Sequence, residues 1–171
     1  AIRHDFAFVT EDRQRQGLAL NMSVLENMHQ VRMNKSKGIL YTASRARQEI
    51  AEVYDAVSIR GCTPDTPVYH LSGGNQQKVV LGKWLMVDSQ FVILDEPTRG
   101  IDVNAKSEIY QLISELARNG KSILMVSSDM PELIALCDRI LVMRKGAISG
   151  EIPREQITEH EILAKALEVN I

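Results

Sequence analysis

The sequence predicts an α/β protein with a mostly parallel sheet and an additional helical subdomain. Two apolar runs, "FVILDEP" and "SILMVSS", have the unbroken hydrophobic character of strands that are buried on both faces. A helical pattern lies between these runs, and alternating strands and helices are typical of a parallel sheet. Residues from about 22 to 87 precede the first run and are expected to be mostly helical.

The bulk composition is that of an ordinary globular domain. The 171 residues are 44% hydrophobic and 25% charged, and the net charge of −2 gives no strong field that would favour nucleic acid or an anionic membrane. Cys62 and Cys137 lie far apart, without a Cys or His at metal-ligand spacing, and are expected to be reduced thiols. No apolar run approaches the roughly 18 residues of a membrane span. Because the chain opens at Ala1 without a visible first element, we expect a piece of a longer protein.

The first half predicts a strand followed by two helices. Residues 6–9 are expected to form a short strand that runs into a polar loop. In "SVLENMHQVRM", Ser23 and Glu26 have the spacing of a capping box, which satisfies two amides at a helix start. The stretch "KSKGI" is expected to end this helix. A second helix is expected over residues 44–57, and "RGCTPDTP" predicts a loop.

The second half predicts a glycine turn and then the α/β alternation. "HLSGGNQQKVVLGKWL" predicts a turn that leads into a helix from near Asn75. A helix over about 103–119 separates the two apolar runs, and Gly120 follows its end. "PELIALC" predicts a short helix, and "RILVMRKGAISGEI" predicts a hairpin with a Lys-Gly turn. Thr158 and Glu161 again have capping-box spacing before a last helix.

The glycine turn has the composition of an anion site. Gly73 and Gly74 let the backbone approach a ligand without a Cβ in the way, and Ser72 can donate its hydroxyl. The following helix start offers free N–H groups and the positive end of its dipole. For this tripeptide alone, the simpler explanation is an ordinary glycine turn before a helix.

Two carboxylates end the first apolar run. Asp95 and Glu96 are expected at the C-terminal end of a buried strand, where open α/β sheets bind ligands. An acidic residue there can hold Mg²⁺ through water, and a second carboxylate can polarise an attacking water. The alternative is a strand that simply ends in acidic residues.

Taken together, "LSGGNQQK" followed by "ILDEPTRGID" resembles the signature loop, Walker B strand and D-loop of the ATP-binding cassette family. With "VSSDMPEL", the chain resembles the second, C-terminal nucleotide-binding domain of bacterial monosaccharide importers of the ribose/galactose type. The resemblance implies an incomplete P-loop NTPase core, because no Gly-x4-Gly-Lys-Ser/Thr loop is present. It also implies three parts: residues 1–21 end the core sheet and carry the Q-loop, 22–87 form the helical subdomain with the signature loop, and 88–171 form the remaining core with Walker B, D-loop, switch region and last helix.

The resemblance implies a role for each motif residue. Asp95 is similar to the Walker B aspartate and Glu96 to the catalytic glutamate, and weak Mg²⁺ binding is expected at Asp95 and Glu11. Glu11 stands at the Q-loop glutamine position and Ser128 at the switch histidine position, and both departures imply a weak or silent site in this domain. The signature loop, expected to meet the γ-phosphate of ATP held by the opposite domain, comprises Leu71, Ser72, Gly73, Gly74, Asn75 and Gln76. The D-loop comprises Arg99, Gly100, Ile101 and Asp102.

The function implied by the resemblance is ATP hydrolysis that powers sugar import at the cytoplasmic face of the bacterial inner membrane, with ATP and Mg²⁺ as cofactors. The implied partners are the first nucleotide-binding domain of the parent chain and the transmembrane permease subunits; no nucleic acid is expected, and a dimer is among the expected states. This piece alone is not expected to hydrolyse ATP. Two alternatives stay open: a regulatory, catalytically silent cassette domain, and a cassette ATPase that acts on ribosomes or DNA. The sequence does not identify the sugar.

Overall fold

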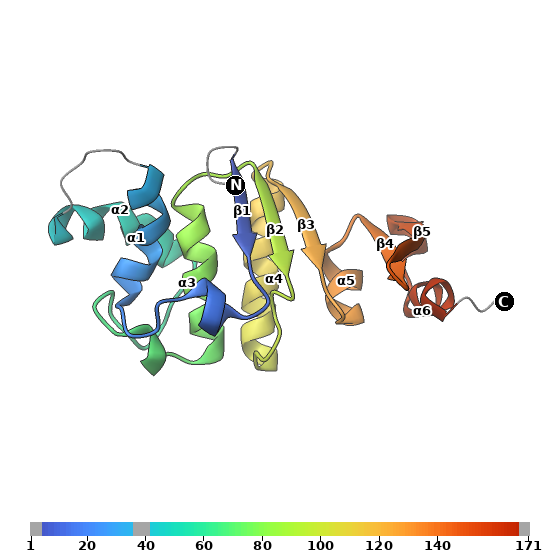
Figure 1. The fold of residues 1–171 in the computed structure, drawn as a ribbon, viewed down its shortest axis with the longest axis horizontal. Helices are drawn as coiled ribbons and strands as arrows, with labels where there is room; N and C mark the ends of the chain where they lie inside the picture. Colours follow the sequence, from blue (N-terminus) through green and yellow to red (C-terminus); the bar gives the residue numbers. More distant parts are fainter. Residues whose placement is uncertain (1–4, 36–41, 168–171) are drawn as a thin grey trace. The chain divides into compact units, whose positions relative to one another are not determined.

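The computed structural model describes residues 5–35 and 42–167, and the chain forms two compact units, Ala1–Val126 and Ser127–Ile171. Figure 1 follows the order of their elements along the chain. The boundary between these compact units falls after Val126. The motifs predict boundaries near residues 21 and 87 instead, and these boundaries stay a prediction. In the described ranges, no helix is both long and apolar enough to cross a membrane.

The first unit contains a three-stranded parallel sheet. Its strands are β1 (Phe6–Val9), β2 (Phe91–Asp95) and β3 (Ser122–Val126), in the order β1-β2-β3. Val9 pairs with Leu94, and Asp95 pairs with Val126, so the carboxyl ends of the three strands share one edge. The predicted α/β class with a parallel sheet is therefore confirmed.

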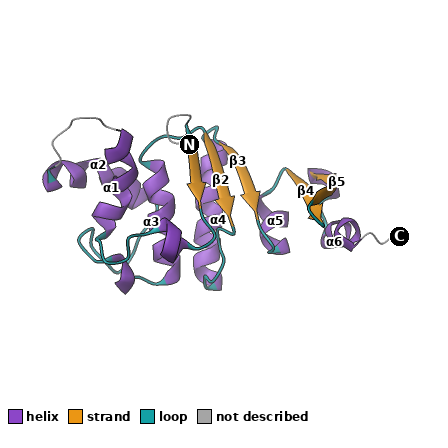
Figure 2. Ribbon diagram, viewed as in Figure 1, coloured by secondary structure: helices purple, strands orange, loops and turns teal. Residues whose placement is uncertain are grey.

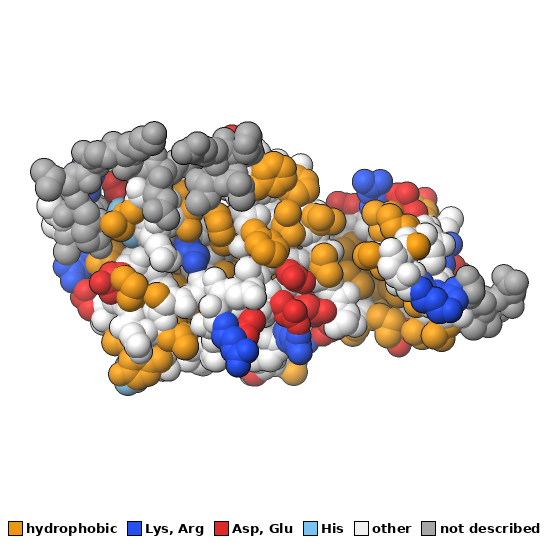
Figure 3. Space-filling view, viewed as in Figure 1, with side chains coloured by type: hydrophobic (Ala, Val, Ile, Leu, Met, Phe, Trp, Pro, Cys, Tyr) orange, Lys and Arg blue, Asp and Glu red, His pale blue; other side chains and the backbone are white. Residues whose placement is uncertain are grey.

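The two faces of this sheet differ in burial. On one face Val9 and Leu94 are fully buried, and this face packs against α3 (Gly73–Leu85) and α4 (Val103–Arg118). Figure 1 shows α4 behind the sheet. On the other face Leu124 and Val126 are 46% and 51% exposed, and Figure 3 shows hydrophobic side chains there. The prediction that "SILMVSS" is buried on both faces is wrong, because within the described residues helices cover one face of the sheet.

Three helices pack together beside the β1 edge of the sheet (Figure 2). They are α1 (Val24–Lys35), α2 (Ala43–Ala56) and α3, and their contact surfaces bury Met28, Ile50 and Val79. Two short elements flank them: the π-helix η2 (Arg13–Gly17) and the 3₁₀-helix η3 (Val68–His70). The predicted break at "KSKGI" falls mainly on residues 36–41, which lie outside the described residues.

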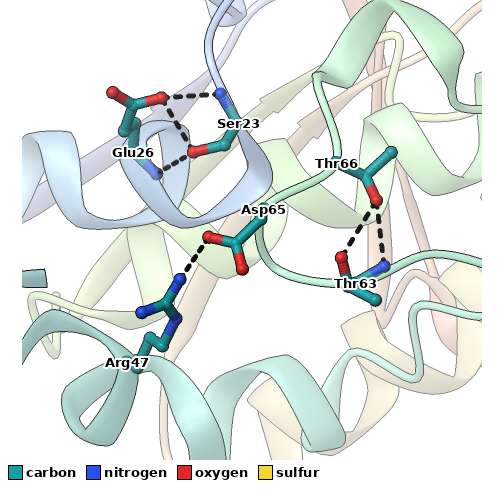
Figure 4. Close-up of polar contacts among 6 residues, drawn as sticks. All are labelled: Ser23, Glu26, Arg47, Thr63, Asp65 and Thr66. Atoms are coloured by element: carbon teal, nitrogen blue, oxygen red, sulfur yellow. Dashed lines mark hydrogen bonds and ion pairs between the residues drawn. The ribbon is translucent and has the colours of Figure 1, made fainter. Parts of the chain in front are cut away.

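The predicted capping box at the start of α1 is confirmed. The Ser23 amide donates to Glu26 Oε2 at 2.8 Å, and the Glu26 amide donates to Ser23 Oγ at 3.2 Å (Figure 4). These hydrogen bonds hold the pKa of Glu26 below its usual value.

The expected loop around residues 60–67 is stabilised by polar contacts (Figure 4). Asp65 pairs with Arg47 of α2 at 2.5 Å, and the Thr63 amide donates to Thr66 Oγ1 at 3.0 Å.

The second unit is built on the predicted hairpin. Its elements are α5 (Met130–Leu136), β4 (Arg139–Arg144), β5 (Ala147–Pro153), the 3₁₀-helix η4 (Arg154–Gln156) and α6 (Glu159–Leu167). β4 and β5 are antiparallel, and both turn residues, Lys145 and Gly146, have positive φ angles of 47° and 82°. This is the backbone of the two-residue turn that matches strand twist. The core of the unit comprises Ile140, Val142, Ile152 and Ile162.

Candidate functional site at the start of α3

Ser72 is the N-cap of α3. Its Oγ accepts a hydrogen bond from the Asn75 amide at 3.4 Å, and its side chain is otherwise exposed. The helix begins at Gly73, two residues before the predicted start near Asn75. In the described parts of the chain, the amides of Gly73 and Gly74 have no hydrogen-bond acceptor. Free amides and the positive helix end together form a surface that suits a phosphate.

The two glycines of the turn have different surroundings. A Cβ on Gly74 would lie 2.5 Å from the Cβ of Ala105, so this glycine is needed where α3 crosses α4. A Cβ on Gly73 would lie 2.8 Å from Nη2 of Arg13 and 3.2 Å from the Gly100 carbonyl oxygen. The close approach that was expected for a ligand at Gly74 is therefore made by the chain's own helix. Ser72 and Gly73 keep exposed surface, whereas Gly74 is buried.

The rest of the signature stretch is tied into the helical layer. Gln76 is buried, and its Nε2 donates to the Val68 carbonyl at 3.3 Å. Asn75 Nδ2 donates to the Arg60 carbonyl at 2.9 Å, so this side-chain amide already has a partner within the chain. Leu71 is half-buried, and its amide donates to the Val68 carbonyl at 3.1 Å. These contacts fix the exposed start of α3 on a rigid base.

The carboxylate pair lies where the sequence places it. Asp95 is the last residue of β2, the middle strand, and Glu96 follows with a φ of 47°. That left-handed conformation costs a non-glycine residue roughly 1–3 kcal/mol and is enriched at functional sites. The Glu96 amide donates to the Val126 carbonyl at 2.8 Å, which extends the β2–β3 pairing by one residue. The strain therefore lies at the edge formed by the carboxyl ends of the strands, which is where open α/β sheets commonly bind ligands.

The segment expected to be the D-loop links β2 to α4. The Arg99 amide donates to the Glu96 carbonyl at 3.1 Å, and Gly100 has a φ of 66° that suits glycine. Ile101 is buried, and Asp102 caps α4 by accepting from the Ala105 amide at 3.0 Å. The same helix α4 meets Gly74, so the D-loop and the signature turn are neighbours.

Glu11 follows β1 at the same edge and forms an ion pair with Arg99 of the D-loop. Its carboxylate therefore already has a cationic partner, which competes with the expected weak Mg²⁺ binding. Across the described ranges, no group of three or more His, Cys, Asp or Glu side chains could hold a metal. A carboxylate at Asp95 has the right donor chemistry for Mg²⁺, which prefers one or two carboxylates together with phosphate oxygens.

Ser128, the expected switch residue, lies in the second unit between β3 and α5, and its side chain is exposed. Beside it, Ser127 Oγ donates to Glu132 Oε2 at 2.7 Å, and the Asp129 amide donates to Ser127 Oγ at 3.0 Å. Glu132 is fully buried. This buried carboxylate orders the segment around Ser128, and sequence reasoning missed it because "PEL" reads as an ordinary helix start.

The parallel sheet, the acidic strand end and the capped glycine turn form the fold of the ATP-binding cassettes. An ATP-binding cassette solved as a dimer in a post-hydrolysis state with ADP and Pi matches with a TM-score of 0.74 at 21% identity, over 90% of this chain and 65% of that one. A part of an ABC transporter complex from Clostridium perfringens matches with a TM-score of 0.75 at 22% identity, over 95% of this chain and 62% of that one.

The family follows from the sequence comparison. Residues 2–99 match the family model described as ABC transporter, and the chain therefore belongs to the ABC transporter family. Three similar proteins are the ribose import ATP-binding protein of Streptomyces avermitilis (46% identity, 99% of this chain), the xylose import ATP-binding protein of Moorella thermoacetica (46%, 97%) and the galactose/methyl galactoside import ATP-binding protein of Escherichia coli (45%, 97%). In each case the match covers 33% of the relative, so the chain spans about a third of the length of these proteins.

Proposed function

We propose that this chain is the part of a monosaccharide importer's ATP-hydrolysing subunit that completes an ATP site held by another nucleotide-binding domain. One observation carries the proposal: at the start of α3 an exposed serine cap precedes two glycines whose amides have no hydrogen-bond acceptor among the described residues. A helix start of this kind attracts phosphate. The chain itself has no Gly-x4-Gly-Lys-Ser/Thr loop that could hold the rest of a nucleotide. We therefore infer that this helix start contacts a phosphate held by another nucleotide-binding domain, as the resemblance to the ATP-binding cassettes implies.

The named relatives support the transport role. Ribose, xylose and galactose import ATP-binding proteins are 41–46% identical over nearly all of this chain. We infer that the partner is the first nucleotide-binding domain of the same parent chain, which closes head-to-tail over ATP, and that permease subunits bind near α1. Membrane association at the cytoplasmic face then comes from the permease.

The nucleotide site at this domain's own sheet edge is proposed to be weak or silent. Glu96 would act as the general base that polarises the attacking water. Asp95 would hold Mg²⁺, which neutralises phosphate charge during hydrolysis. Two positions argue against efficient turnover. Ser128 has no ring with which to contact a γ-phosphate, and Glu11 brings negative charge in place of a neutral amide. Of the two sites in a closed pair, we assign hydrolysis to the one that uses this chain's signature turn.

A second candidate function is a regulatory cassette domain without hydrolysis of its own. The serine at position 128 and the ion pair of Glu11 with Arg99 favour it. Action on ribosomes or DNA has less support, because the net charge of −2 does not suit a polyanion and the D-loop reads "RGID".

Calorimetry of the isolated chain tests whether it needs another domain to bind ATP. MgATP titrated into this 171-residue chain should bind with a Kd weaker than about 1 mM, since the loop that cradles the β- and γ-phosphates is missing. The full-length parent protein serves as the positive control and should bind in the micromolar range. A micromolar Kd for the chain alone would mean that it holds a complete site, and the proposal would be wrong.

A further inference from the structure

Arg13 lies between the D-loop and the signature turn. Its Nη1 donates to the Arg99 carbonyl at 2.7 Å, and its Nη2 donates to the Gly100 carbonyl at 3.3 Å. The same Nη2 occupies the space where a Cβ of residue 73 would be, 2.8 Å away. One guanidinium group therefore contacts both loops at once.

The side chain of Arg13 is half-buried. Its Nε is buried and, among the described residues, has no hydrogen-bond partner, and burial lowers the pKa of Arg13. A planar guanidinium can give two parallel hydrogen bonds to two neighbouring carbonyls, whereas an ammonium group cannot reproduce that fork. The arrangement is specific for arginine.

The rest of the segment 11–17 makes contacts of the same kind. Glu11 pairs with Arg99 of the D-loop, and Gln14 Nε2 donates to Gln76 Oε1 of α3 at 3.1 Å. The Gly17 carbonyl accepts from the buried ammonium of Lys83, near the other end of α3. This single turn therefore contacts the D-loop through two side chains and α3 through two more contacts.

We propose that Arg13 is a positioning residue that sets the D-loop against the signature turn. The inference rests on the proposed function, because it assumes that these two loops act together at a shared ATP site. Without Arg13, the carbonyls of Arg99 and Gly100 lose their donors, and Gly100 already has the backbone freedom of glycine. The D-loop then samples other conformations, and the two loops no longer meet the nucleotide in one geometry.

The test uses the full-length parent protein with a spin label at Val103→Cys, the 82%-exposed residue that follows the D-loop. In Arg13→Ala the label should become more mobile without nucleotide. The kcat of ATP hydrolysis should fall roughly tenfold to a hundredfold, with the KM for ATP changed less than about twofold. Arg13→Lys keeps the charge and should restore at most part of kcat, because it cannot bridge both carbonyls.

Arg15→Ala is the matched control. Arg15 lies in the same π-helix, and its side chain is 88% exposed with a 3.7 Å pair to Asp12, so neither label mobility nor kcat should change. The inference is overturned if Arg13→Ala and Arg15→Ala have the same spectrum, if KM rises while kcat stays constant, or if Arg13→Lys behaves as wild type. If Arg13→Ala does not fold, the label mobility and the kcat of Arg13→Lys are compared with those of the wild type instead. The spectrum without nucleotide does not depend on the ATP site, so it tests the role of Arg13 separately from the proposed function. If the label is mobile in Arg13→Ala but Ser72→Arg hydrolyses ATP normally, only the proposed function is contradicted.

Discussion

Replacing Ser72 with arginine in the full-length parent protein should reduce sugar-stimulated ATP hydrolysis by at least about a hundredfold. Ser72 is the exposed cap of α3, and directly after it come the amides of Gly73 and Gly74, which have no acceptor in the part of the chain that the structure describes. A long side chain at this position fills the space through which a phosphate would reach those amides. Loss of the cap hydrogen bond costs a further ~1 kcal/mol of helix stability.

The control for this change is Ser44→Arg. Ser44 is an exposed serine in the first turn of α2, remote from the signature turn in the chain. It introduces the same side chain and charge, and should leave hydrolysis within about twofold of wild type. Steady-state hydrolysis by the assembled transporter in the presence of its sugar gives the comparison, and thermal unfolding checks that both variants are folded. Unchanged hydrolysis in Ser72→Arg would remove the basis for a shared site.

Gly74→Ala should destabilise the chain by about 1–3 kcal/mol, because the new methyl group would lie 2.5 Å from the Cβ of Ala105. Both atoms belong to helices, so the overlap cannot be relieved by rotating a side chain. Urea unfolding of the chain, followed by circular dichroism, measures the change.

Ala105→Gly in the Gly74→Ala background identifies the cause. The second change removes the methyl group that is in the way, although glycine inside α4 costs about 1 kcal/mol by itself. The double variant should be more stable than the sum of the two single effects by at least about 1 kcal/mol. Additive effects would mean that the contact between α3 and α4 is not what requires a glycine.

Sequence patterns predicted the features that depend on residues close together in the chain. The capping box at Ser23 depends only on Glu26, three residues later in the chain. The Lys145–Gly146 turn depends only on two adjacent residues that both adopt a positive φ. The parallel sheet followed from apolar runs separated by a helical pattern. The acidic pair at the end of β2 and the glycine turn before α3 were both found from short motifs.

Features that depend on tertiary contacts could not be predicted in this way. Arg13 reaches the carbonyl of a residue 86 positions away, and nothing in "EDRQRQG" distinguishes it from the exposed Arg15. The role of Gly74 depends on where α4 crosses α3. The exposed side of β3 likewise depends on which sheet face the helices cover, whereas the run "SILMV" places apolar side chains on both faces. The buried state of Glu132 depends on the packing of its whole unit.

The central claim is that the start of α3 contacts a nucleotide carried by another domain. Alkylation of Ser72→Cys in the otherwise cysteine-free, full-length parent protein measures this contact, with Cys62 and Cys137 replaced by serine. MgATP at about ten times its Kd should slow the reaction roughly tenfold, and replacing the P-loop lysine of the other domain should abolish that protection. An alkylation rate that is the same with and without MgATP, or protection that survives loss of that lysine, would contradict the claim.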